Sequence, residues 1–140
     1  MTASITAIVD EIRASITIPT DWQRDATCAR PDARSSKTLY LWPDREQRVP
    51  EGTGEMDDGR FDLRLELVYA PIGDQAMVSR LRDVSTALGT AADDLWGWIL
   101  THRTGTTYEF LQADEIRYDN TRDGFRGVSA TVRGYRLVTS

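Results

Sequence analysis

The chain has 140 residues, a formal net charge of -5, and 40% hydrophobic and 28% charged residues. This size is near the commonest for one domain, so we expect residues 1–140 to form a single domain around one hydrophobic core. The acidic balance argues against a broad basic surface for nucleic acid, and no apolar stretch is long enough to predict a membrane span. The N-terminal segment has no basic start, so we expect no signal peptide.

Few residues of the types used for catalysis or metal binding are present. Cys28 is the single cysteine, which excludes an internal disulfide and a cysteine zinc site. His102 is the single histidine, so any Ser/His/Asp or Cys/His arrangement would have to use it. Its place after a predicted helix, beside Arg103, suits a helix C-terminus instead. We therefore expect no enzyme, no catalytic residue, no metal site and no cofactor.

Apolar residues at helical spacing predict an N-terminal helix over residues 3–16, with Thr2 or Ser4 as its cap. Its buried stripe would consist of Ile5, Ile8, Val9, Ile12 and Ile16. Residues 19–37 carry many turn formers and are expected to be irregular, with Trp22 packed onto the body of the protein.

Two predicted strands flank a long polar insertion. Residues 38–42 form a short aromatic strand that Pro43 is expected to end, because proline cannot donate a hydrogen bond to the ladder. Residues 61–69 alternate between an apolar face and a charged face. The insertion over 43–60 is the tip of a long projecting β-hairpin if the two strands pair. We expect the apolar face of 61–69 to line the core and its charged face to meet water or another subunit.

Helical spacing returns in the second half of the chain. It predicts a helix over residues 75–88, which Gly89 is expected to end. A second helix over 91–102 follows, with Asp93 and Asp94 in its first turn, where negative charge is favoured. This second helix is apolar nearly all round, so it should lie between the sheet and another surface.

Two final strands, 106–118 and 125–138, are joined by a hairpin turn. In the first of them, Tyr108 and Phe110 are expected to share a face. In the second, the apolar residues change face near Gly134. Either a bulge there or contact of both sheet faces with protein would explain the change.

Adjacent acidic residues give no catalytic pair. Asp114 and Glu115 are neighbours on a predicted strand, so their side chains should point to opposite faces. Asp57 and Asp58 fit the solvated tip of a loop. The acidic run from Glu51 to Asp58 lacks the spacing and the final glutamate of a calcium-binding loop.

The predicted order is helix, strand, long hairpin loop, strand, two helices, strand, strand. It indicates an α+β fold with a mostly antiparallel sheet of about four strands, helices packed on one face, and a long projecting β-hairpin loop.

The element order, the size and the ending of the chain resemble those of one known family. The features are the N-terminal helix, the strand TLYLWP, the charged loop, the strand and turn FDLRLELVYAPIGD, the helical pair with its tryptophan-rich second half, and the ending EIRYDNTRDGFRGVSATVRGYRLV. Together they resemble the tail terminator, or tail completion, proteins of long-tailed bacteriophages.

The resemblance implies a structural role. Such proteins form a ring, typically a homohexamer, at the head-proximal end of the tail tube, where the ring ends tube assembly and meets the head–tail connector. The implied partners are further copies of the chain, the tail tube protein and the connector protein, with no membrane. DNA would pass through an acidic ring without specific binding. The implied location is the virion tail, and the host cytoplasm during assembly.

The resemblance also implies which residues meet these partners. The loop over 44–60 is the candidate for docking onto the tube or connector, through Arg45, Arg48, Glu51, Glu55, Asp57 and Asp58. The candidate subunit-interface residues lie on two strands: Asp62, Arg64, Glu66, Arg133 and Arg136.

Two other functions stay open. A head–tail connector or neck protein of the same particle is the first. A small ligand-binding or enzymatic α+β domain, with a pocket between sheet and helices, is the second. The missing pair of nucleophile and base counts against the enzyme.

Overall fold

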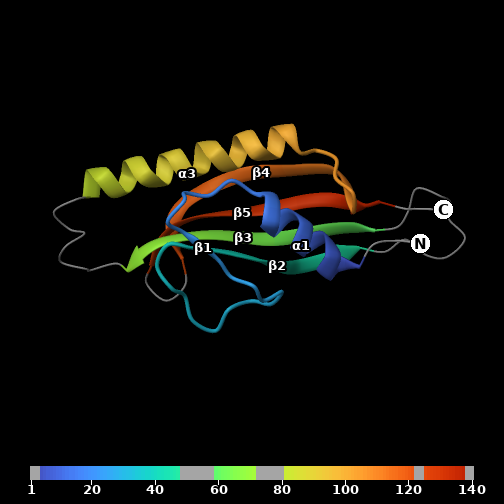
Figure 1. The fold of residues 1–140 in the computed structure, drawn as a ribbon, viewed down its shortest axis with the longest axis horizontal. Helices are drawn as coiled ribbons and strands as arrows, with labels where there is room; N and C mark the ends of the chain where they lie inside the picture. The colour runs from blue at the N-terminus through green and yellow to red at the C-terminus, as the bar shows by residue number, and fades with distance from the viewer. Residues whose placement is uncertain (1–3, 48–58, 72–80, 122–124, 138–140) are drawn as a thin grey trace, which may run out of the picture.

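A computed structural model describes residues 4–47, 59–71, 81–121 and 125–137 (Figure 1). Within them lie the helices α1 (Ile5–Ser15) and α3 (Leu81–Thr101). The strands are β1 (Gln23–Arg24), β2 (Thr38–Gln47), β3 (Arg60–Pro71), β4 (Tyr108–Thr121) and β5 (Phe125–Arg136). They form one five-stranded sheet in the order β1-β2-β3-β5-β4. The predicted α+β class is confirmed, with one more strand than expected, because the two-residue β1 was not predicted.

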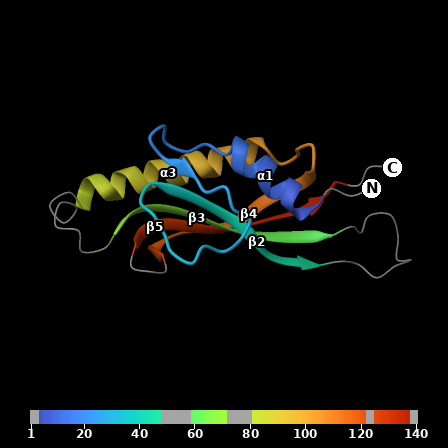
Figure 2. The ribbon, with the colours of Figure 1, turned by 60° about the horizontal axis from the view of Figure 1, so that its bottom comes forward.

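The sheet is antiparallel apart from one short pairing. Among the described strands, only β1 and β2 run parallel. β2 and β3 pair as the arms of a hairpin, as expected, and so do β4 and β5. The final strand, β5, is inserted between β3 and β4. Both helices cover the same face of the sheet (Figures 1 and 2), which confirms the predicted arrangement in layers.

The main hydrophobic core fills the space between the helices and the sheet. The apolar face of β3 and the inner face of α1 supply seven buried residues: Phe61, Leu63, Leu65, Leu67, Ile8, Val9 and Ile12. Burying each large side chain contributes about 1.5–3 kcal/mol, so these two patterns determine which face of the sheet the helices cover. Ser4 caps α1 as expected, since its Oγ accepts a hydrogen bond from the amide of Ala7 at 3.1 Å.

α3 is one continuous helix, so the prediction of two helices separated by Gly89 is wrong. Buried residues continue along one side of α3 past this glycine, from Leu88 to Ala92. Packing of that stripe on the sheet outweighs the roughly 1 kcal/mol that a glycine costs within a helix. Asp93 and Asp94 therefore lie in the middle of α3 and are exposed, and the prediction that they occupy a first turn is wrong.

β2 continues past Pro43 to Gln47, so the prediction that this proline ends the strand is wrong. The register between β2 and β3 shifts between Pro43 and Arg45. Among the described strands, β1 pairs only with the first two residues of β2, so Pro43 lies where β2 has a single neighbour. A strand edge tolerates a missing N–H group, and a bulge re-aims the chain.

β4 is irregular where it pairs with β5. Its register shifts between Glu109 and Gln112, and Phe110 within that shift has a φ of 61°, in the left-handed region. Phe110 is therefore 59% exposed whereas Tyr108 is 2% exposed, and the prediction that they share a face is wrong. The pairing of β5 with β3 runs through Gly134 without a shift, so the bulge considered there is absent from that pairing.

Glu11 fastens α1 to the turn that precedes β4. Its carboxylate accepts hydrogen bonds from the amide and hydroxyl of Thr106, at 2.9 and 2.6 Å, and from the amide and hydroxyl of Thr107, both at 3.1 Å. Burial raises the pKa of Glu11, but the hydrogen bonds from these four donor groups outweigh it and hold the pKa below its ordinary value of 4.5. Burial, with a smaller effect of the Glu11 charge, raises the pKa of Tyr108 to about 12.

Gly105 leaves room for this contact. A Cβ atom at Gly105 would lie 2.5 Å from Glu11 Oε1 and 2.5 Å from the Tyr108 ring. Gly105→Ala should therefore lower the free energy of unfolding by about 1–3 kcal/mol, because both neighbours must move. Gly97→Ala, in α3, is the control: its Cβ would meet nothing within 4 Å. It should raise the free energy of unfolding by about 0.5–1 kcal/mol in urea titrations, and equal effects of the two substitutions would contradict this account.

The lowered pKa of Glu11 predicts a pH dependence. Its contribution to stability is present above the unfolded-state value of 4.5 and is lost as pH falls through the lower folded-state value. Glu11→Gln should cost about 1 kcal/mol at neutral pH and should flatten the acid side of the stability curve. Asp10→Asn, which removes an exposed pair with Arg13, should cost no more than about 0.5 kcal/mol. Urea titrations across the acid range test this, and an unchanged curve for Glu11→Gln would refute it.

Candidate functional site

The sheet face turned away from the helices carries the charged residues of β3. We define this open face by the residues of β3 that point to it: Asp62, Arg64, Glu66 and Val68. Its β2 side is covered by the segment between β1 and β2, residues 25–37, which we call the covering segment. This segment passes beneath the sheet in Figure 2. A second apolar cluster lies there, formed by Tyr40, Trp42 and Val68. The opposite side of the open face, over β5 and β4, is the candidate site.

A buried ion pair holds the covering segment in place. Arg34 Nη2 lies 3.0 Å from both carboxylate oxygens of Glu66, and the two side chains are 3% and 5% exposed. The Arg34 guanidinium also lies 5.9 Å from the ring centroid of Trp42, and its Nη1 donates to the carbonyl of Pro31 at 3.2 Å. The amide of Ser35 donates to the Tyr40 hydroxyl at 2.7 Å. Glu66 is thus an internal structural residue.

Three of the five candidate interface residues are buried within the chain. Besides Glu66, these are Asp62, at 7% exposure, and Arg136, at 8%. Asp62 Oδ1 lies 3.5 Å from Arg60 Nε and 3.8 Å from Arg133 Nε. The prediction that the charged face of β3 meets water is therefore wrong at Asp62 and Glu66.

Arg136 lies on the helix side of the sheet, at the edge of the core. It pairs with Glu46, and burial lowers the pKa of its guanidinium. The remaining two candidates, Arg64 and Arg133, are half-buried on the open face. Their contact with another subunit stays a prediction.

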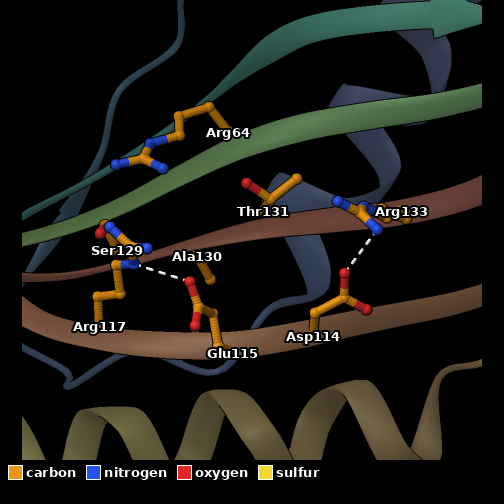
Figure 3. A pocket seen from close by; sticks show the side chains of 8 residues that line it. All are labelled: Arg64, Asp114, Glu115, Arg117, Ser129, Ala130, Thr131 and Arg133. Atoms are coloured by element: carbon orange, nitrogen blue, oxygen red, sulfur yellow. Dashed lines mark hydrogen bonds and ion pairs between the residues drawn. The ribbon is translucent and has the colours of Figure 1, made fainter.

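A hollow of about 480 Å³ lies on the open face over β3, β5 and β4 (Figure 3). Its lining residues are Arg64, Asp114, Glu115, Arg117, Ser129, Ala130, Thr131 and Arg133. Two of the three arginines have acidic partners: Arg117 pairs with Glu115 at 2.7 Å, and Arg133 pairs with Asp114. Among the described residues, Arg64 has no acidic partner, and no dashed line reaches its side chain in Figure 3. Within the described residues, the hollow therefore holds one arginine without an acidic partner.

Asp114 and Glu115 both line this hollow, so the prediction that they point to opposite faces is wrong. The register between β4 and β5 shifts between Ala113 and Ile116, and this bulge breaks the alternation of side chains. Each carboxylate faces its own arginine. The two carboxylates therefore balance the charges of Arg117 and Arg133.

A second, smaller hollow of about 310 Å³ adjoins the first. It is lined by Arg60, Phe110, Gln112, Arg133, Gly134 and Tyr135. Phe110 and Tyr135 meet edge to face, with ring centroids 6.1 Å apart, and are 59% and 44% exposed. Arg133 borders both hollows, which therefore form one surface of arginine and aromatic side chains. Such residues are enriched where proteins bind each other.

The outer side of α3 carries another exposed apolar patch. Trp96 is 41% exposed and Leu100 is 47% exposed. They are four residues apart, and therefore lie on the same side of the helix. Gly97, between them in sequence, is also exposed. The sequence signal for this patch was the nearly all-round apolar character of the helix. Arg34, in contrast, carried no such signal.

The other residues that the sequence singled out lie outside the two hollows or outside the described residues. Arg45 is exposed on β2, whereas Arg48, Glu51, Glu55, Asp57 and Asp58 lie outside the described residues. His102 stacks on Trp98 with ring centroids 4.6 Å apart, and its Nδ1 lies 2.9 Å from the Trp98 carbonyl oxygen. It thus directly follows the C-terminal end of α3, as expected. In the described parts of the chain, no group of three or more His, Cys, Asp or Glu residues could hold a metal ion.

No protein-family model matches the chain, and a search of curated proteins gives no match. Across the described residues, no helix combines the length and the apolar character needed to cross a membrane.

The buried ion pair predicts an effect on stability. Glu66→Gln leaves the Arg34 charge buried without its partner and should lower the free energy of unfolding by about 3–5 kcal/mol. Arg64→Gln is the matched control on the same strand, because Arg64 is half-buried and has no acidic partner among the described residues. It should change stability by about 0.5 kcal/mol or less. Thermal or urea unfolding measures both, and a Glu66→Gln variant as stable as the control would rule out a structural role for the pair.

Proposed function

We propose that this protein is a structural subunit of a long-tailed bacteriophage. Several copies, typically six in the family it resembles, form a ring at the head-proximal end of the tail tube. The ring ends tube assembly and joins the tube to the head–tail connector. It resides in the virion tail and assembles in the host cytoplasm. The proposal assigns the chain no catalytic residue, metal or cofactor.

One observation carries the proposal: the molecule exposes two unlike surfaces on opposite layers. The first is the α3 patch of Trp96 and Leu100, and the second is the arginine and aromatic surface of the open face. When two unlike surfaces of one chain bind each other, the contact is head to tail, and such contacts close into rings when the rotation permits. A subunit of this kind suits a ring better than a two-fold dimer.

Charge and chemistry also favour a structural role over catalysis. The formal net charge of -5 suits a ring through which DNA passes, because an acidic channel does not retain the polyanion. The acidic side chains of the larger hollow face arginines, and His102 is packed against Trp98 at a helix end. These groups are engaged with neighbouring residues where they lie.

The test is capping of tail tubes. The protein should bind one end of tubes assembled from the tail tube protein of the same phage, and should shorten tubes when present during assembly. Electron microscopy measures both tube length and end binding. Tubes that grow to normal length with bare ends would count against a terminator. Binding to the connector alone would instead favour a neck protein of the same particle.

A further inference from the structure

The outer side of α3 has the features of a contact surface and lacks a covering partner within the described chain. Trp96 and Leu100 project from it with 41% and 47% of their surfaces exposed. Gly89 lies seven residues before Trp96 and Gly97 lies three residues before Leu100, so both border this patch, and a Cβ atom at either would meet nothing within 4 Å. Each glycine costs a helix interior roughly 1 kcal/mol relative to alanine. In the described part of the molecule, no neighbouring atom comes close enough to require a glycine at either position. Close approach of another surface would require one.

The open face offers the complementary chemistry. Its larger hollow holds Arg64, whose charge no acidic residue of the described chain balances. Beside it, Phe110 and Tyr135 present exposed aromatic rings. α3 carries the opposite charge, with three acidic residues, Asp83, Asp93 and Asp94, against the single basic Arg82. Asp93 lies on the same side of α3 as Trp96 and Leu100, since it precedes them by three and seven residues.

We propose that the outer side of α3 in one copy docks on the open face of the next copy. Trp96 enters the larger hollow among the arginines, and Asp93 pairs with Arg64. The inference rests on the proposed ring and names the contact that closes it. Arginine over tryptophan is a favourable cation–π arrangement, and tryptophan, tyrosine and arginine are the residues that most often dominate binding energy.

A second copy fits better head to tail than face to face. If two α3 patches packed against each other, the Asp93 side chains of the two copies would lie near each other. The Arg64 charge would then stay unbalanced. Two open faces would bring the arginines of both copies together. The α3-to-sheet contact pairs apolar with aromatic surface and negative with positive charge, and it leaves each copy one surface of each kind for the next neighbour.

Charge reversal tests the contact. Arg64→Glu and Asp93→Arg should each raise the concentration needed for half-assembly at least tenfold, as measured by light scattering after size exclusion. The double variant, with the pair reversed, should recover most of the loss. Asp94→Arg is the matched control, because it makes the same change one residue along the helix, about 100° around its axis. Of the three sites, Asp93 and Asp94 are exposed and Arg64 is half-buried on the open face, so circular dichroism melting should stay near that of the unmodified protein.

A mixing experiment tests the head-to-tail arrangement. Leu100→Glu disables only the α3 surface and Arg64→Glu disables only the open face, so each variant alone should remain monomeric. Mixed together, they should form a one-to-one heterodimer and nothing larger, since one intact surface of each kind remains. Leu100→Ala provides a milder second variant in case the glutamate disturbs folding.

The outcomes separate this inference from the proposed function. If the unmodified protein assembles and the charge-reversal variants assemble equally well, the contact is wrong and the ring stands. Variants that are monomeric alone but fail to pair when mixed also overturn the head-to-tail contact. An unmodified protein that stays monomeric into the high micromolar range overturns both the ring and the contact.

Discussion

The rest of the structure depends on one constraint, which is that β3 is buried on both faces. Apolar packing buries one face, and an ion pair buries Glu66 on the other. The apolar residues of β3 pack under the helices, whereas Glu66, on the other face, is buried against Arg34. A charge buried alone would cost several kcal/mol, so the segment that carries Arg34 must lie on the open face whenever β3 is folded. The segment covers the β2 side of that face and leaves the β5 and β4 side exposed. The position of the candidate site follows from this division.

The exposed part of the sheet and the outer side of α3 then give the molecule two unlike surfaces. One is rich in arginine and exposed aromatic side chains, and the other combines apolar side chains with acidic residues and glycine. A chain with a self-complementary surface tends to form two-fold dimers, whereas a chain with two different complementary surfaces forms rings or filaments. The proposed function rests on this distinction and on the resemblance in element order, without a catalytic group.

The sequence predicted the features that depend on local periodicity and missed those that depend on distant partners. The alternation of β3 and the stripe of α1 correctly indicated the core. Gly89 and Pro43 did not end their elements, because packing on the sheet and a position at a strand edge outweighed local preference. The Arg34–Glu66 pair joins residues 32 positions apart, and no spacing rule reveals such a pair. The bulge that places Asp114 beside Glu115 likewise depends on pairing with β5.

The central claim is that identical copies meet through unlike surfaces and close into a ring. Electron microscopy of the purified, unmodified protein, at concentrations where its mass exceeds that of one chain, tests this most directly. We predict closed rings of uniform size in which every copy places α3 against the open face of its neighbour. Two-fold dimers joined through the same surface of both copies, or particles that remain single chains, would contradict the account.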